Sequence, residues 1–436
     1  MPALHWAPQC LRRAAPQARL GRGSAAQHPG RGTLKRLLII SNGHGEDFIA
    51  ARLGEALRER LPTLELAAFP LVGLGQQLER AGLSVAGPRR RLPADGFTMH
   101  APRLIWRDLR AGLVSLTLRQ AAYLRRQRPD AVLVVGDVYG QMHASLVPAP
   151  RRVLQPLVSV YHQTSGATSR SPLRYFMERF RGPELFLLRR ANKVYTRDAA
   201  TAGYLAGLGV KRAAYLGNPM MDGLDAAPLW TELEEDGPAG APWRALLTEG
   251  PVVALLPGSR EQSVPSVQLM LAALRLGPDS LGLVAWTHPQ LPDPPLGWRV
   301  ADPPPLQGVL GAWRSEAGGH HVWWLRGRFP AVLASAGAAL GTAGTANEQA
   351  VGRGLPVVAF EVPPLYGRDY LRNQSRLLGD GLLVSQPEPG AIAASLQAAL
   401  TDPDVRARAR RAGEERMGGP GASAALADDL ADWLAG

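Results

Sequence analysis

From residue 34 onward, short β-branched and apolar runs alternate with longer stretches rich in Ala, Leu and Arg. This alternation is typical of parallel sheets covered by helices. The pattern predicts a first series of strands at residues 34–41, 64–69, 131–137, 157–162, 193–196 and 213–216. A second series is predicted at residues 251–257, 281–287, 321–325, 336–341, 355–360 and 381–384.

A segment rich in proline and glycine, residues 218–250, separates the two series and is predicted to be a linker. We therefore expect an α/β chain with two Rossmann-like domains whose parallel sheets face an interdomain cleft. The acceptor domain would span residues 34–217 and the nucleotide-sugar domain residues 251–410. Residues 411–436 are expected to form a C-terminal helix that packs back toward the first domain.

Composition narrows the class of protein. The 436 residues are 46% hydrophobic and 20% charged, which is typical of a globular chain. No apolar run reaches the roughly 18 residues of a spanning helix. Cys10 is the only cysteine, which excludes a disulfide framework and a cysteine-based metal site.

The net charge of +12 is concentrated near the start of the chain. Residues 1–36 carry seven of the basic side chains and no acidic one. We therefore expect residues 1–33 to be a disordered basic tail. The charge excess does not indicate a nucleic-acid partner.

Four predicted strands end in loops with glycines and polar residues. Because parallel strands end at one edge of a sheet, such loops gather there and form binding sites. In the first series these loops contain Gly43-His44-Gly45 and Gly136-Asp137, and in the second Gly258-Ser259-Arg260 and Gly344-Thr345-Ala346.

The two loops of the second series suit a bound diphosphate. Glycine lets backbone amides approach a phosphate, and a following helix N-terminus favours negative charge. Ser259 adds a hydroxyl donor and Arg260 a permanent cation. The structural alternative is two tight turns and a surface arginine.

Several common nucleotide and hydrolase motifs are missing from the sequence. Residues 38–47 lack the third glycine of the dinucleotide fingerprint, and neither GxxxxGK[ST] nor GxSxG occurs. Asp402-Pro403-Asp404, the one Asp-x-Asp, begins a late predicted helix and does not follow a strand. We therefore expect no metal site and no cofactor.

Three short motifs resemble those of lipid-A-disaccharide synthase and the related bacterial synthase-like proteins. They are Leu255-Leu256-Pro257-Gly258-Ser259-Arg260, Tyr215-Leu216-Gly217-Asn218-Pro219 and Gly344-Thr345-Ala346. The resemblance spans about residues 34–430, and the peptidoglycan glycosyltransferase that uses UDP-N-acetylglucosamine is a more distant relative. The resemblance to the synthase family implies two Rossmann-like domains of the GT-B type and inversion at the anomeric carbon without a metal. It also implies a UDP-sugar held mainly by the second domain.

The resemblance also implies roles for single residues of the second domain. Ser259 and Arg260 would contact the diphosphate. Glu348 or Gln349 would bind the ribose hydroxyls; the usual acidic position falls on Gln349, while Glu348 has the better chemistry. Asn373-Gln374 resembles the pair that reads the sugar hydroxyls; the alternative is an ordinary amide pair exposed on a helix.

Two residues of the first domain compete as the base that deprotonates the acceptor. Asp137 matches the aspartate proposed for this role in the synthase family, although the surrounding pattern is only partly kept. His44 competes because histidine is the side chain that commonly serves as a general base near neutral pH; alternatively, it orders the loop. His162 is a weaker candidate for the base. Glu46-Asp47 are interpreted as first-turn acids that complement the helix dipole.

Residues 100–128 and 169–190 combine apolar and basic side chains. They suit either an enzyme resting on anionic lipid or ordinary helices that pack on the sheet. We therefore expect a cytoplasmic glycosyltransferase with a UDP-sugar donor, a lipid or lipid-linked acceptor and peripheral membrane contact. The alternatives are a UDP-sugar 2-epimerase and a non-catalytic nucleotide-sugar-binding protein.

Overall fold

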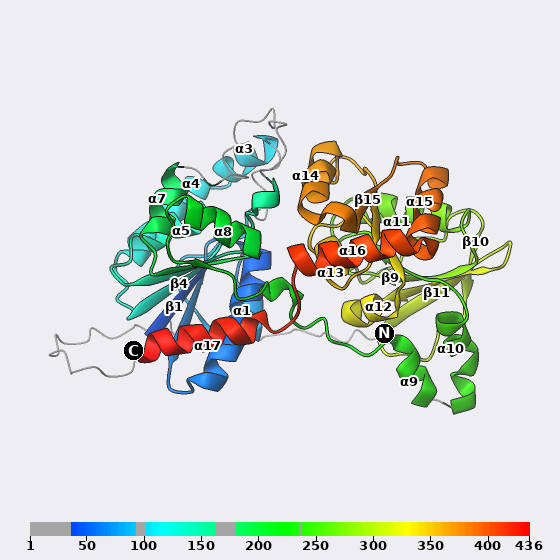
Figure 1. The fold of residues 1–436 in the computed structure, drawn as a ribbon, viewed down its shortest axis with the longest axis horizontal. Coiled ribbons are helices and arrows are strands. Elements are labelled where there is room, and N and C mark those ends of the chain that lie inside the picture. The colour runs from blue at the N-terminus through cyan, green and yellow to red at the C-terminus, as the bar shows by residue number, and fades with distance from the viewer. Residues whose placement is uncertain (1–35, 93–101, 163–179, 181, 236) are drawn as a thin grey trace, which may run out of the picture.

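The computed structural model describes residues 36–92, 102–162, 180, 182–235 and 237–436, and contains two sheets with helices packed around each (Figure 1). The predicted basic tail, residues 1–33, lies outside the described residues.

The first sheet has seven strands in the order β3-β2-β1-β4-β5-β6-β7, and every pairing is parallel. Its strands are β1 (Arg36–Ser41), β2 (Glu65–Pro70), β3 (Ser84–Val85), β4 (Ala131–Val135), β5 (Arg151–Gln155), β6 (Lys193–Thr196) and β7 (Ala213–Ala214). Its helices are α1 (His44–Arg60), α2 (Gln76–Arg80), α3 (Pro102–Arg110), α4 (Leu113–Leu124), α5 (Val138–Ala144), α7 (Gly182–Arg189) and α8 (Ala199–Gly207), with a 3₁₀ turn η2 (Val160–His162).

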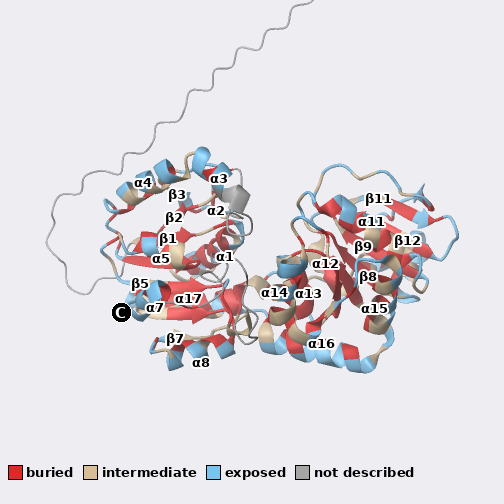
Figure 2. Ribbon diagram, turned by 90° about the horizontal axis from the view of Figure 1, so that it is seen from above, coloured by how far each residue is buried: buried red, intermediate tan, exposed pale blue. Residues whose placement is uncertain are grey.

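Strand β1 shows why its apolar run is continuous. Successive side chains of a strand point to opposite faces of the sheet. Leu37 and Ile39 join the core that includes α1, whereas Leu38 and Ile40 join the core on the opposite face. Both faces are thus buried, as the strands of Figure 2 show.

The second sheet has eight strands in the order β10-β11-β12-β9-β8-β13-β14-β15. They are β8 (Val252–Leu256), β9 (Ser280–Ala285), β10 (Trp298–Ala301), β11 (Val309–Ser315), β12 (His320–Leu325), β13 (Ala338–Gly341), β14 (Val357–Ala359) and β15 (Leu382–Val384). The helices after residue 217 are α9 (Leu229–Glu235), α10 (Ala241–Thr248), α11 (Ser263–Leu274), α12 (Phe329–Ser335), α13 (Thr345–Gly352), α14 (Arg368–Leu378), α15 (Pro389–Thr401), α16 (Pro403–Arg416) and α17 (Ala422–Ala435), and the 3₁₀ turns are η3 (Pro219–Met221), η4 (Gly237–Ala239) and η5 (Gly379–Gly381).

The predicted architecture of two Rossmann-like domains is confirmed, with two corrections to the strands. The strand predicted at residues 157–162 is wrong, because the strand there is β5 and residues 160–162 form η2. The second sheet is mixed, since β11 runs antiparallel to both β10 and β12.

Two parts of the chain connect the halves. The segment predicted as a linker, residues 218–250, includes α9 and α10, whose Leu229, Leu233 and Leu247 belong to a core of the second half. After α16 the chain returns, and α17 packs along α1 of the first half (Figure 1). Among the described residues, no helix combines the length and apolar character needed to span a bilayer.

Candidate functional site

The first group of predicted residues lies where the strand order of the first sheet reverses. From β1 the chain proceeds to β2 and β3 on one side, and then crosses to β4 on the other. Loops at such a switch point diverge and leave room for a ligand at the carboxyl ends of the strands. The loops after β1 and β4 carry His44 and Asp137, respectively.

Asp137 is tied to both loops. Asn42, which follows β1, donates from Nδ2 to Asp137 Oδ1 at 2.5 Å, and the backbone N–H of Tyr139 donates to the same oxygen at 2.8 Å. Asp137 is therefore also the N-cap of α5. Gly136 has φ +154, and a Cβ there would lie 2.7 Å from that of Asn42, so the close approach of the loops requires glycine.

Further buried carboxyl groups lie near Asp137. Burial raises the pKa of Glu46 to about 7, and repulsion from Asp137 and Asp47 adds to that rise. Burial also raises the pKa of Glu184, on α7, to about 7, with Asp137 again contributing. The pKa of Asp137 itself is raised by burial, although its hydrogen bonds oppose this. Asp137 thus lies within electrostatic reach of two buried carboxyl groups whose pKa values are raised to about 7.

Glu184 was missed by the sequence analysis. Its Oε1 accepts from Gln155 Nε2 at 2.6 Å and from Gln141 Nε2 at 3.4 Å. No strand-end motif marks it, because it reaches the site from a helix. Glu46 was noted only as a first-turn acid; its burial, with 8% of its surface exposed, is the additional observation.

The two histidines occupy different places. His44 is exposed at the start of α1, between Gly43, the N-cap, and the exposed Gly45, and its ring lies against Gly73. His162 lies in η2, where burial lowers its pKa to about 3, with Arg197 and Arg376 adding repulsion. It is therefore neutral, and Ser159 N donates to its Nδ1 at 3.4 Å.

The second group lies at the switch point of the second sheet. The chain leaves β8 for β9 on one side and returns to β13 on the other, with Leu256 paired to Gly341. The two glycine loops therefore leave neighbouring strands. Gly258 has φ +82, and a Cβ there would lie 2.9 Å from Gln262 Nε2 and 3.7 Å from Thr342 O, so the loops are in contact.

Polar groups are available along these loops. Ser259 is exposed and Arg260 is half-buried. Gly344 precedes α13, whose first residues, the exposed Thr345 and half-buried Ala346, present the helix N-terminus to solvent. An N-terminus in this position favours an anion.

The predicted amide residues of the second domain have different surroundings. Gln374 is buried; its Nε2 donates to Ala343 O and Gly344 O, both at 3.0 Å, and its Oε1 accepts from Asn347 Nδ2 at 3.0 Å and from Tyr366 Oη. It holds the glycine turn in place. Asn373 is half-buried beside it.

The two residues predicted to bind the ribose also differ in their surroundings. Gln349 is buried and donates from Nε2 to Met220 O at 2.7 Å, in the segment that links the halves. Glu348 is half-buried, and its Oε2 accepts from Nη2 of Arg197, a residue of the first half, at 3.0 Å. Arg197 directly follows β6, at the carboxyl end of a strand, where binding loops gather. This position was the signal in the sequence that could have identified it.

No family model matches the chain, and no curated protein matches its sequence. Solved structures match along nearly the whole chain. CalG4, the calicheamicin glycosyltransferase, has a TM-score of 0.57 at 17% identity, covering 92% of this chain and 98% of that one. MnaA of S. aureus, in a co-structure with UDP, has a TM-score of 0.54 at 14% identity, covering 92% and 97%.

A Listeria monocytogenes protein assigned as a UDP-N-acetylglucosamine 2-epimerase has a TM-score of 0.53 at 14% identity, covering 91% of this chain and 94% of that one. At these identities the likeness shows the fold and not the reaction. The chain has the GT-B arrangement of two Rossmann-like domains.

Proposed function

We propose that this chain is an inverting, metal-independent glycosyltransferase that moves a hexose or N-acetylhexosamine from a UDP-sugar to a lipid or lipid-linked acceptor. One observation carries the proposal: each sheet has its polar and glycine-rich loops at its switch point. The loops of the second sheet suit an anion, and those of the first hold a carboxylate that suits a base.

The donor site would be built from the second domain. Backbone amides around Gly258 and Gly344 would hold the diphosphate, with Ser259 and Arg260 donating to its oxygens. The N-terminus of α13 adds the positive end of a helix dipole. These groups would stabilise the charge on the leaving UDP, the task that a metal performs elsewhere. Glu348 would accept from the ribose hydroxyls.

Transfer would form one carbon–oxygen bond, break another and move one proton. The acceptor hydroxyl oxygen attacks the anomeric carbon, while the bond from that carbon to the UDP oxygen breaks. Asp137 takes the hydroxyl proton, and UDP leaves with the electron pair of the broken bond. Attack from the face opposite the leaving group inverts the anomeric carbon. His44, at the same end of the sheet, is the competing base.

Exposed apolar and basic side chains support a lipid acceptor. On α3 and α4, Trp106 is 67%, Val114 56% and Leu118 66% exposed, with exposed Arg107 and Arg119 close by in the sequence. Cations beside apolar side chains suit anionic lipid. These helices belong to the first half, which would carry the acceptor (Figure 1).

Transfer can be tested by incubating the protein with UDP-glucose or UDP-N-acetylglucosamine in EDTA, with and without a detergent-solubilised bacterial lipid extract. We expect UDP release and a glycolipid product only with lipid. UDP should also raise the melting temperature, and Arg260→Ala should weaken UDP binding at least tenfold, through the loss of about 1.5–3 kcal/mol. Arg299→Ala, on the edge strand β10, is the control.

Stabilisation by UDP that depends on magnesium would contradict this donor site, as would stabilisation that survives Arg260→Ala unchanged.

A UDP-sugar 2-epimerase is the second candidate. The grouping of Glu46, Asp137 and Glu184 favours it, because proton removal and return at a sugar carbon use several carboxyl groups. An epimer formed from UDP-N-acetylglucosamine without lipid would establish this reaction. Binding of UDP-sugar with neither product would indicate a non-catalytic nucleotide-sugar-binding protein.

A further inference from the structure

Arg197, a residue of the first domain, reaches the proposed ribose site. It lies in the turn between β6 and α8, and this turn is fixed because Asp198 Oδ1 caps α8 by accepting from Thr201 N at 2.7 Å. The side chain of Arg197 is 3% exposed, and its Nη2 is 3.0 Å from Glu348 Oε2. The same nitrogen lies 3.6 Å from Met417 Sδ.

Stability alone is a poor explanation for this ion pair. Removing a guanidinium and a carboxylate from water costs several kcal/mol per ion, and apolar residues of similar size often stabilise as well. Within the described chain, Arg197 Nε is buried without a hydrogen-bond partner, which adds to the cost. A pair with such a cost is better explained by the geometry that it imposes on Glu348.

The pair leaves half of the carboxylate free. Glu348 Oε2 accepts from Arg197, while Oε1 makes no hydrogen bond to any residue that the structure describes. Glu348 lies in the first turn of α13, directly after the glycine turn. A guanidinium that holds one oxygen fixes the carboxylate plane, so that the other oxygen is positioned to accept from a hydroxyl.

Other contacts hold the two halves together beside this pair. Tyr161 Oη, in η2, donates to Glu415 at 2.7 Å, and the guanidinium of Arg416 lies 4.2 Å from the centre of the Tyr161 ring. The position of Arg197 relative to Glu348 therefore depends on how the two halves are placed.

We propose that Arg197 is a positioning residue that orients Glu348 across the two domains for recognition of the nucleotide ribose. This inference rests on the proposed UDP-sugar site. A complete ribose site then exists only when the first domain is seated against the second, so nucleotide selectivity and domain arrangement are coupled.

The test compares the affinities for UDP and 2′-deoxy-UDP by calorimetry. The wild-type protein should prefer UDP by on the order of tenfold or more, as expected for a hydrogen bond to a charged group. Glu348→Gln and Arg197→Met should each abolish most of this preference while changing the affinity for 2′-deoxy-UDP little. The double variant should lose no more than either single one, and Arg197→Lys should restore part of the preference.

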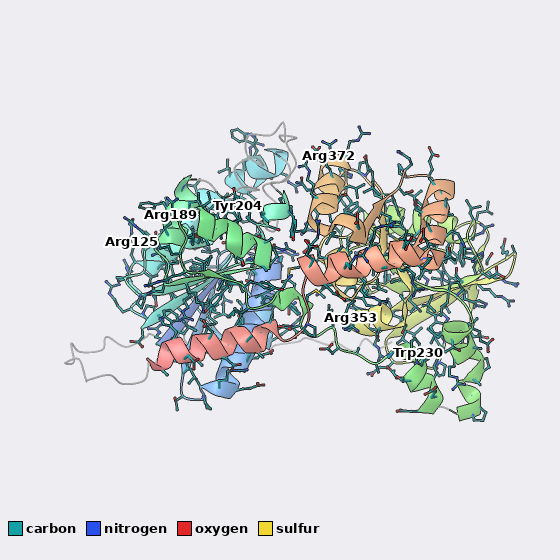
Figure 3. The ribbon with its side chains drawn as sticks, in the orientation of Figure 1. Arg125, Arg189, Tyr204, Trp230, Arg353 and Arg372 are labelled. Carbon is teal, nitrogen blue, oxygen red and sulfur yellow. The ribbon has the colours of Figure 1, made fainter. Side chains whose placement is uncertain are left out.

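Arg353→Met is the matched control. Arg353, labelled in Figure 3, caps the other end of α13 and pairs with Asp225 at 3.5 Å, with the two side chains 33% and 66% exposed. This variant should keep the wild-type preference.

An equal loss of affinity for both nucleotides in Arg197→Met and Arg197→Lys would overturn the inference, as would an unchanged preference. A wild-type protein that binds neither nucleotide would overturn the proposed function as well. Binding without transfer would remove the reaction and leave this inference standing.

Discussion

Asp137 combines a structural and a proposed chemical role in one side chain. Its Oδ1 accepts hydrogen bonds from Asn42 Nδ2 and from the N–H of Tyr139. Through the second of these bonds, Asp137 caps α5. A base needs a carboxylate that can take up a proton, whereas a cap needs only an oxygen that accepts a hydrogen bond. A substitution that keeps the cap can therefore separate the two roles.

Asp137→Asn makes this separation, because asparagine caps helices as well as aspartate does. Turnover should fall by about 10²–10⁴, while the affinity for UDP changes little and the protein melts near the wild-type temperature. His44→Gln should cost less. Steady-state kinetics with a verified acceptor measure both. The reverse ranking would assign the proton transfer to His44, and two silent variants would direct the search to His162.

Glu184 should make the free energy of unfolding depend on pH, and the direction of this dependence follows from its raised pKa. Its pKa rises from 4.5 to about 7 on folding, so the folded state retains a proton that the unfolded state has lost between these values. The stabilising contribution is present at low pH and is lost as the pH rises through 7. The shift corresponds to about 3 kcal/mol at most.

Wild-type protein should therefore have a higher free energy of unfolding at pH 5 than at pH 8, and Glu184→Gln should reduce the difference. The variant amide can also donate to Gln141 Oε1, which is buried without a partner in the described part of the chain. Urea unfolding at the two pH values measures this. A wild-type difference that Glu184→Gln leaves intact would show that other groups cause it.

At the scale of elements, the predictable parts were those in which the local pattern decides. The buried strands β1, β4 and β8 are uninterrupted apolar runs, and the loops after them carry glycine and polar residues. Strand β5 was not predicted because polar side chains interrupt its apolar pattern. These side chains bind partners that are distant in the sequence. Arg152 pairs with Asp429 on α17, and Gln155 binds Glu184 on α7.

The same reason explains the parts of the site that were missed. The edge strands β10 and β11 are partly exposed, so their apolar pattern is weak. Glu184 and Arg197 acquire their places from the packing of helices and domains, which no spacing along the chain encodes. Only the strand-end position of Arg197 was open to prediction.

The side chain of Gln374, on α14, holds the turn before α13. Gln374→Ala would leave Ala343 O, Gly344 O and Asn347 Nδ2 without its amide, so we expect a loss of more than about 2 kcal/mol in the free energy of unfolding. Asn373→Ala, at the neighbouring half-buried position, should cost less stability and more affinity for the donor sugar. Denaturant unfolding and UDP-sugar titration distinguish the two. Equal stability losses would contradict the assignment of Gln374 to the turn.

At the scale of the whole molecule, the two segments that connect the halves are hydrogen-bonded to each other. Asp222, in the first connecting segment, accepts from the N–H groups of Gly421 and Ser423, both at 2.6 Å, at the start of α17. Further along α17, Asp429 accepts from Lys193 Nζ and Tyr195 Oη, both at 2.6 Å. The last helix is thus anchored on the first sheet and keeps the halves close, while α3 and α4 stay uncovered by it.

The exposed side chains of α3 and α4 lead to a prediction for membrane contact. Trp106→Ser combined with Leu118→Ser should weaken binding to vesicles containing phosphatidylglycerol at least tenfold, because each side chain would lose about 1.5–3 kcal/mol of apolar burial. Leu296→Ser, which alters a leucine 95% exposed on the second half, should bind like the wild type. Co-sedimentation at low and high salt distinguishes the electrostatic from the apolar contribution to vesicle binding. The electrostatic contribution of Arg107 and Arg119 falls with ionic strength, while the contribution of the apolar side chains does not. If the double variant sediments like the wild type, α3 and α4 do not carry the contact with the bilayer.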